Sequence, residues 1–149
     1  MGVGVGWVQP CPTWLLRAAV SFAFCSALMH ARRGWGWLQG FQPQLGRYDV
    51  IWIQWAIGHL TDDDFVLFFA ACAKGLTADG IVVVKENNCS LGFLVDKDDS
   101  SVTRSDKYFR ELFKRCNYEL FLVEKQKGFP KELFAVRMYA LKPIQKRGK

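Results

Sequence analysis

The stretch "IWIQWAIGHLTDDDF" at residues 51–65 passes from a strand pattern to a helix pattern within a few residues. Its first part belongs to "YDVIWIQW" at 48–55, a run of β-branched and aromatic residues typical of a strand buried on both faces. Thr61 then has the character of a helix N-cap, and the three aspartates after it suit the positive end of a helix dipole. Three side chains able to bind a ligand separate the strand from the helix: Gln54, Trp55 and His59.

The helix that follows Thr61 shows an apolar stripe with the spacing i, i+3, i+4, i+7, formed by Phe65, Phe68, Phe69 and Cys72. Gly75 is the predicted end of this helix. The run "GIVVVKEN" at 80–87 predicts a second buried strand, and the polar stretch "VDKDDSSVTR" at 95–104 predicts a loop. The chain therefore alternates strand and helix in the way that builds a mainly parallel sheet.

The rest of the chain predicts one more helix and two strands. The helix has its apolar stripe at Phe109, Leu112, Phe113 and Cys116. No helix separates the runs "YELFLVEKQ" at 118–126 and "LFAVRMYAL" at 133–141, so we expect them to pair as an antiparallel ribbon. The whole pattern is the second half of an α/β domain, with helices on both faces of its sheet and its first strands missing.

Three regions divide the chain. Residues 1–37 hold four of the six tryptophans and no acid, and we expect an irregular apolar leader there. Within it, 14 of the 18 residues at 14–31 are apolar, so a secretory signal or a membrane anchor is an alternative interpretation, although the run is shorter than the ~20 residues of a typical span. Residues 38–142 are the expected domain and 143–149 a basic tail. Without earlier strands, one edge of the strand at 48–55 would be exposed and prone to aggregation.

Charge and cysteine usage limit the classes of partner. Residues 38–132 carry 12 basic and 14 acidic side chains, which argues against a nucleic-acid-binding body, and no membrane association is expected. The five cysteines form an odd set without short paired spacings, which favours reduced thiols in the nucleus and cytoplasm and predicts no metal site.

Polar residues at the strand ends suggest proton-transfer chemistry. His59 follows the first strand, Asn87 ends the second, and an acidic group, Asp96, Asp98 and Asp99, lies in the next predicted loop. In open α/β sheets, ligands bind outside the carboxyl ends of the strands, so these groups should converge. Carboxylates raise the pKa of a nearby imidazole, which suits proton abstraction near neutral pH.

Four segments resemble the protein α-N-terminal methyltransferases: "LQGFQP", "YDVIWIQWAIGHLTD", "GIVVVKENN" and "DSSVTR". The resemblance runs from about Leu38 to Leu141. It implies a class I methyltransferase fold of Rossmann-like type, S-adenosyl-L-methionine as cofactor, and methylation of the free α-amino group of proteins that begin Xaa-Pro-Lys or Xaa-Pro-Arg.

The resemblance also assigns roles to residues. It implies proton abstraction by His59 and Asp99, with Asn87 orienting the amine. It places the cofactor against Leu38, Gln39 and Gln54. The substrate peptide is expected at four positions: Trp55, Asp96, Asp99 and Ser101.

The chain also departs from the family pattern. "GVGVG" at 2–6 follows no strand, and no acid precedes Asp49, so the glycine-rich turn and the ribose-binding acid of class I enzymes have no candidate. Phe134 replaces a tyrosine of the family, and Glu86 an aspartate. Two hypotheses follow: an N-terminal protein methyltransferase, or a catalytically silent fragment that binds Xaa-Pro-Lys termini or associates with a full-length paralogue.

Overall fold

The computed structural model describes residues 19–23, 36–128, 130 and 132–144. In chain order the elements are β1 (Ala19–Ala23), α2 (Gly36–Gln39), β2 (Tyr48–Gln54), the 3-10 turn η1 (Ile57–His59), α3 (Asp62–Gly75), β3 (Leu76–Asn88), β4 (Phe93–Asp96), β5 (Ser101–Arg104), α4 (Asp106–Arg115), β6 (Tyr118–Lys125) and β7 (Ala135–Pro143).

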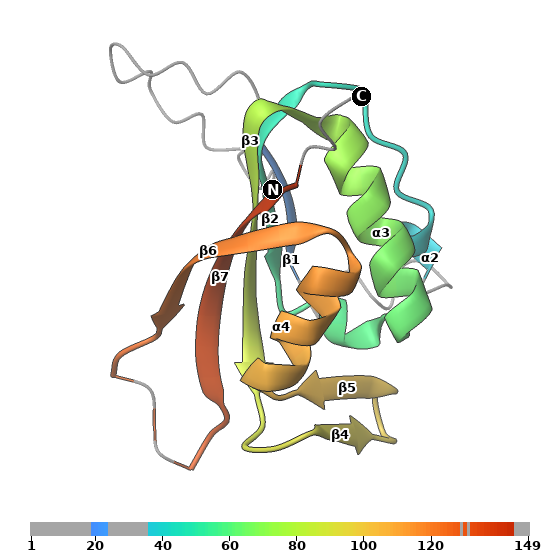
Figure 1. Ribbon diagram of the computed structural model, residues 1–149. Helices are drawn as coiled ribbons and strands as arrows, with labels where there is room; N and C mark the ends of the chain where they lie inside the picture. Colours follow the sequence, from blue (N-terminus) through green and yellow to red (C-terminus); the bar gives the residue numbers. More distant parts are fainter. Residues whose placement is uncertain (1–18, 24–35, 129, 131, 145–149) are drawn as a thin grey trace, which may run out of the picture.

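Five strands form one sheet in the order β1-β2-β3-β7-β6, and β4 and β5 form a separate hairpin (Figure 1). The pairs β1–β2 and β2–β3 are parallel, whereas β7 pairs antiparallel with both β3 and β6. The predicted α/β sheet and its antiparallel ribbon are therefore confirmed.

The amino-terminal segment differs from the expectation. The sequence predicts an irregular leader over residues 1–37, yet β1 lies inside it and pairs with β2 from Val50 to Gln54. The edge of β2 predicted to be exposed is thus covered by β1. Short apolar runs give no periodicity from which a five-residue strand can be recognised.

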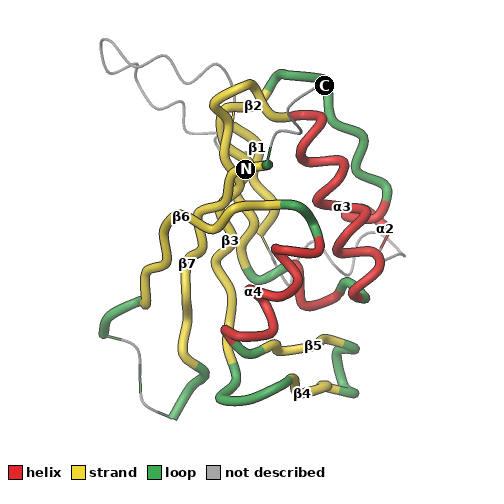
Figure 2. The backbone as a smooth tube through the Cα atoms, viewed as in Figure 1, coloured by secondary structure: helices red, strands yellow, loops and turns green. Residues whose placement is uncertain are grey.

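The helices of the described part of the chain all lie on one face of the sheet (Figure 2), whereas helices on both faces were expected. α3 and α4 pack there through aromatic rings, with Phe65 and Phe69 each about 6 Å from Phe113, at 5.9 and 5.8 Å between ring centroids. Ile51 and Ile53 of β2 are fully buried in the same core. The predicted helical stripes are therefore the core-facing sides.

α3 begins and ends where the sequence predicts, but the reason for the glycine at its end differs from the expected one. The Thr61 hydroxyl accepts a hydrogen bond from the Asp64 amide at 3.2 Å, as expected of an N-cap. The helix ends at Gly75, but Gly75 does not have the positive φ of a glycine cap. A Cβ at Gly75 would lie 2.6 Å from the Pro43 Cβ, so close packing is the reason for glycine here.

The acidic stretch at 95–104 is also more regular than predicted. Instead of a loop it forms most of the β4–β5 hairpin. In this hairpin Phe93 pairs with Arg104 at one end, and Asp96 pairs with Ser101 at the other. The hairpin lies beyond the carboxyl ends of β2 and β3, below α4 in Figure 1. It closes the end of the sheet where the sequence places its candidate residues.

Candidate functional site

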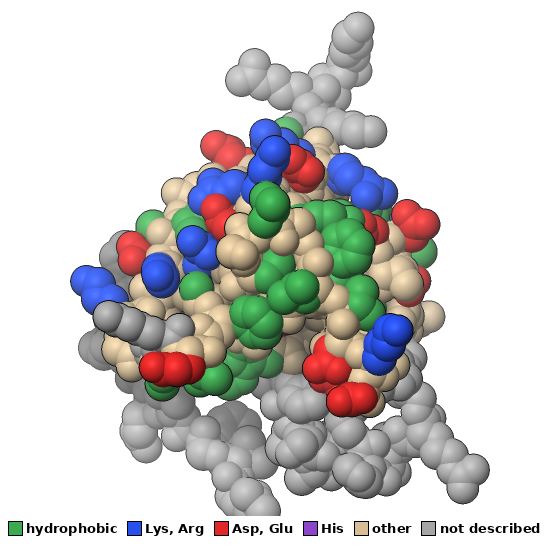
Figure 3. All heavy atoms as spheres, turned by 90° about the horizontal axis from the view of Figure 1, so that it is seen from below, with side chains coloured by type: hydrophobic (Ala, Val, Ile, Leu, Met, Phe, Trp, Pro, Cys, Tyr) green, Lys and Arg blue, Asp and Glu red, His purple; other side chains and the backbone are tan. Residues whose placement is uncertain are grey.

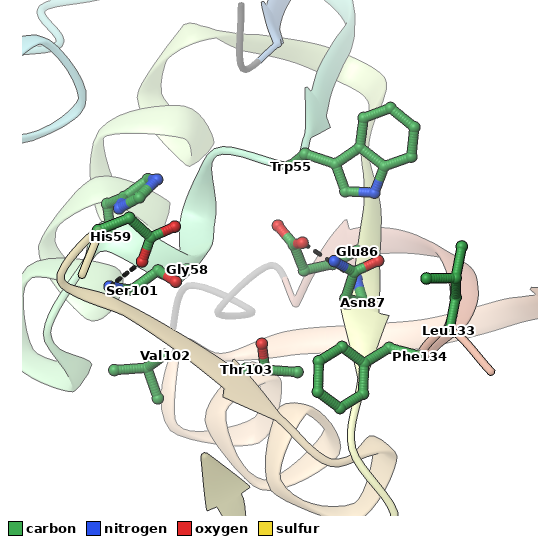
Figure 4. Close-up of a pocket in the computed structure, with 11 residues that line it drawn as sticks. Trp55, Gly58, His59, Glu86, Asn87, Ser101, Val102, Thr103, Leu133 and Phe134 are labelled. Carbon is green, nitrogen blue, oxygen red and sulfur yellow. Dashed lines mark hydrogen bonds between the residues drawn. The ribbon is translucent and has the colours of Figure 1, made fainter. Parts of the chain in front are cut away.

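A cavity of about 390 Å³ opens at the carboxyl ends of β2 and β3 (Figure 4). Four segments contribute to it: the turn after β2, the end of β3, the hairpin and the chain before β7. Its polar and aromatic lining includes Trp55, His59, Glu86, Asn87, Asp99 and Ser101. Residues separated by more than forty positions in the chain thus meet at one point.

The exposed surface around this end of the molecule carries an apolar patch. Seen from below, hydrophobic side chains gather in the middle of the face, with acidic and basic side chains around them (Figure 3). Phe93, Leu94 and Val95 of β4 are each more than half exposed. Leu133 and Phe134 line the cavity and are also exposed, so the mouth combines apolar walls with a polar interior.

Five of the predicted site residues line the cavity: Trp55, His59, Asn87, Asp99 and Ser101. Asp96 does not. It lies at the far end of β4, where its Oδ1 accepts a hydrogen bond from the Asp98 amide at 2.9 Å. Asp99 makes the equivalent bond with the Ser101 amide at 2.9 Å, which fixes the turn that carries it to the cavity (Figure 4).

Trp55 directly follows β2 and has a strained conformation. Its φ of +48° lies in the left-handed region, which is uncommon for a bulky residue and characteristic of functional turns. The Lys85 ammonium lies 5.2 Å from the centroid of the Trp55 rings, within cation–π range. The strand therefore turns abruptly at Trp55, and its indole is placed at the cavity wall.

His59 is the last residue of η1 and is partly buried. Burial lowers the pKa of its imidazole, and this effect outweighs the Asp99 charge and a hydrogen bond with the Ser100 backbone, both of which raise it. The expectation that nearby carboxylates raise this pKa is therefore right for Asp99 and wrong for the net shift. A neutral imidazole at neutral pH can accept a proton.

Glu86 is a site residue that the sequence reasoning missed. It is 7% exposed, its Oε1 accepts a hydrogen bond from the Asn87 amide at 3.0 Å, and its fully buried Oε2 makes no hydrogen bond of standard geometry within the described residues. Burial raises the pKa of Glu86 to about 7, although backbone amides and the charge of Arg104 favour the carboxylate. Its burial could have been predicted from the sequence, because side chains alternate between the two faces of a strand and Glu86 therefore shares a face with Val82 and Val84.

The three residues expected at the cofactor lie outside this cavity. Leu38 is 3% exposed and belongs to the hydrophobic core. Gln39 is exposed, and its Nε2 donates to Asp64 Oδ2 at 3.5 Å. Gln54 accepts a hydrogen bond from Trp52 Nε1 at 3.2 Å on the face of the sheet opposite the helices. None of the three lines the cavity.

S-adenosylmethionine therefore fits the described residues only in part. Gln54 ends a parallel strand and Trp55 follows it, at the edge of the sheet where a nucleotide-like ligand is expected. The sequence nevertheless has no acid before Asp49 that could accept hydrogen bonds from ribose hydroxyls.

Two features are absent from the described residues. Among them, no three His, Cys, Asp or Glu side chains come close enough to hold a metal ion. No helix in this part of the chain has the length and apolar character to cross a membrane.

Comparison with known proteins gives a consistent result. The family described as AdoMet dependent proline di-methyltransferase matches residues 32–142. "Alpha N-terminal protein methyltransferase 1" of Oryza sativa subsp. indica is 57% identical over 116 residues, which cover 75% of this chain and 38% of the rice protein. "N-terminal Xaa-Pro-Lys N-methyltransferase 1" of Danio rerio is 47% identical over 105 residues, covering 70% of this chain and 47% of the fish protein.

A solved structure agrees with these relatives. That of a SAM-dependent methyltransferase from Leishmania major has a TM-score of 0.70 and 35% identity, and the match covers 84% of this chain and 55% of that one. The chain thus spans less than half the length of the two relatives described above.

Proposed function

Because this chain belongs to the AdoMet-dependent proline di-methyltransferase family, we propose that it acts in methylation of the α-amino group of proteins that begin Xaa-Pro-Lys or Xaa-Pro-Arg. S-adenosylmethionine is the methyl donor of the family and supplies an electrophilic methyl group when bound. The observation that carries the proposal is the convergence of His59, Asn87, Asp99 and Trp55 on one cavity.

The cavity residues suit the handling of an amine. An α-amino group has a pKa of about 7.7 to 8.0, so most of it is protonated at neutral pH and lacks a free electron pair. His59 is neutral there and can accept the proton on a ring nitrogen, and the carboxylate of Asp99 stabilises the imidazolium that results. The amide oxygen of Asn87 can accept a hydrogen bond from the amine and so orient it.

The same cavity accounts for the proposed sequence preference. The Trp55 ring offers a flat apolar face to a proline in the second position. Asp99 carries negative charge at the hairpin turn, where a Lys or Arg in the third position can approach it. Asp96 lies farther along the hairpin and adds to the negative potential of this loop.

Peptide binding tests the proposal without requiring catalysis. We expect a peptide beginning Ser-Pro-Lys to bind, and its N-acetylated form to bind at least about tenfold more weakly, because hydrogen bonds to a charged group contribute ~1.5–3 kcal/mol. Isothermal titration calorimetry measures both. Equal affinities for the two peptides would contradict the proposal.

A matched pair of variants tests the preference for lysine. Asp99→Asn should reduce the advantage of Lys over Gln in the third position of the peptide. Asp79→Asn should leave it unchanged, because Asp79 is exposed and does not line the cavity.

A second candidate function is binding without methyl transfer, which is favoured by the position of Leu38, Gln39 and Gln54 outside the cavity. We expect the isolated 149-residue chain to bind S-adenosylmethionine at least about a hundredfold more weakly than a protein in which a relative's amino-terminal portion precedes Leu38. Several lost polar contacts of ~1–3 kcal/mol each justify this magnitude. Calorimetric titration with the cofactor measures it, and similar affinities for the two proteins would show that residues 1–37 suffice.

A further inference from the structure

The hairpin that carries Asp99 and the turn that carries His59 are joined by one buried side chain. Arg104 is the last residue of β5 and is only 2% exposed. Its Nη2 donates to the Leu60 carbonyl oxygen at 2.7 Å and to Asp62 Oδ1 at 2.8 Å, and its Nε donates to the same oxygen at 3.1 Å. Leu60 directly follows His59, so the guanidinium holds the turn immediately beside the imidazole.

The main chain of Arg104 is held by a different element. Its carbonyl oxygen accepts a hydrogen bond from Asn88 Nδ2 at 3.3 Å, and the same amide nitrogen donates to the Tyr139 hydroxyl at 2.9 Å. Asn88 directly follows Asn87 at the end of β3. Arg104 therefore contacts the immediate neighbours of two site residues, through its backbone on one side and its side chain on the other.

The hairpin and the turn also meet closely at the backbone. A Cβ placed on Gly58 would lie 3.3 Å from the Val102 carbonyl oxygen and 3.8 Å from the Ser101 Cβ. Asp62 is fixed in turn, since the Tyr108 hydroxyl donates to its Oδ2 at 2.5 Å. The contact between the hairpin and the η1 turn is therefore held by close backbone packing and by an Asp62 side chain that is itself fixed.

We propose that Arg104 is a positioning residue that sets the placement of Asp99 relative to His59 by fastening the hairpin to the η1 turn. Arg104 does not line the cavity and acts through these two residues. Lysine cannot replace it, because one ammonium group lacks the planar fork that reaches Leu60 and Asp62 together. That this placement of Asp99 beside His59 serves proton transfer rests on the proposed function. The placement itself can be measured without a ligand.

A double-mutant cycle on the His59 titration tests the inference, with NMR of the imidazole as the readout. Asp99→Asn should lower the pKa of His59 in the native background, because Asp99 raises it. In the Arg104→Lys background the same substitution should produce no shift or a clearly smaller one. Glu86 also lines the cavity, and the charge of Arg104 lowers its pKa. Its influence on His59 should cancel in the cycle, because lysine keeps the positive charge and Glu86 is present in all four proteins.

Arg115→Lys is the matched control. Arg115 also approaches Asp62, at 3.9 Å, but it is 53% exposed and contacts Asp63 rather than the hairpin. Its variant should keep the full Asp99-dependent shift. An undiminished shift in the folded Arg104→Lys protein, with native circular dichroism, would overturn the inference.

A peptide readout separates this inference from the proposed function. The affinity of Arg104→Lys for a Ser-Pro-Lys peptide should fall about tenfold, because a misplacement of about 1 Å in a site is costly. If the native protein does not bind the peptide, the proposed function fails while the titration cycle still decides the role of Arg104. If the native protein binds it and Arg104→Lys binds equally well, the positioning role is wrong.

Discussion

Replacing Asp62 with alanine should lower the free energy of unfolding by about 3 kcal/mol, because it leaves the buried guanidinium of Arg104 without its carboxylate. The side chain of Asp62 is 28% exposed and that of Arg104 is 2% exposed, so water can approach only one of the two partners. The value is therefore at the lower end of the range for broken buried pairs. Urea titration of the native and variant proteins measures the difference.

The neighbouring aspartate provides the control. Asp63 is 94% exposed, and among the described residues its ion pair is with the exposed Arg115 at 3.5 Å, so Asp63→Ala should change stability by no more than about 0.5 kcal/mol. Equal effects of the two substitutions would mean that both residues act only through the helix dipole.

The contribution of Asp62 should also depend on pH. Burial alone would raise the pKa of Asp62, but hydrogen bonds from Tyr108 and Arg104 and the charges of Arg104 and Arg115 outweigh it, so the pKa lies below its usual value. A depressed pKa in the folded state gives stability that is present above the unfolded value and is lost as pH falls through the folded one. The difference between native protein and Asp62→Ala should therefore shrink below about pH 4.

Glu86→Gln should stabilise the protein above neutral pH by up to about 3 kcal/mol, because the native carboxyl must ionise in a buried site. Its pKa of about 7 in the folded state lies above the ordinary value of 4.5. The folded protein therefore binds the proton more tightly, and this residue makes stability fall as pH rises from about 4.5 to 7. Glutamine retains an oxygen for the Asn87 amide and does not ionise.

The measurement is the difference in unfolding free energy between native protein and Glu86→Gln at pH 5 and pH 8. His59 contributes the opposite slope, since a lowered imidazole pKa makes stability rise with pH, and it cancels in the difference. We expect an advantage of the variant below about 1 kcal/mol at pH 5 and of about 3 kcal/mol at pH 8. A difference independent of pH would show that Glu86 has an ordinary pKa.

This variant should also bind the peptide amine more weakly. Glu86 lines the cavity, and its carboxylate adds negative charge beside the position proposed for the amine. Substitutions at functional sites commonly increase stability and reduce function in this way.

The amino-acid sequence by itself determined the elements whose signals are short-range. The cap at Thr61, the apolar stripes of α3 and α4 and the buried runs of β2 and β3 depend on neighbours within a few residues. The antiparallel ribbon followed from the short connection between β6 and β7. The position of the site followed from the rule that parallel strands present their carboxyl ends at one edge.

Only the tertiary structure decided what depends on partners far along the chain. β1 is a strand because β2 offers it an edge, and β4 and β5 form a hairpin because each pairs with the other. Asp62 and Asp63 look alike in the sequence, yet only Asp62 faces the buried Arg104, 42 residues away. The shifts of His59 and Glu86 arise from burial, which is set by the packing of whole elements and which no local pattern encodes.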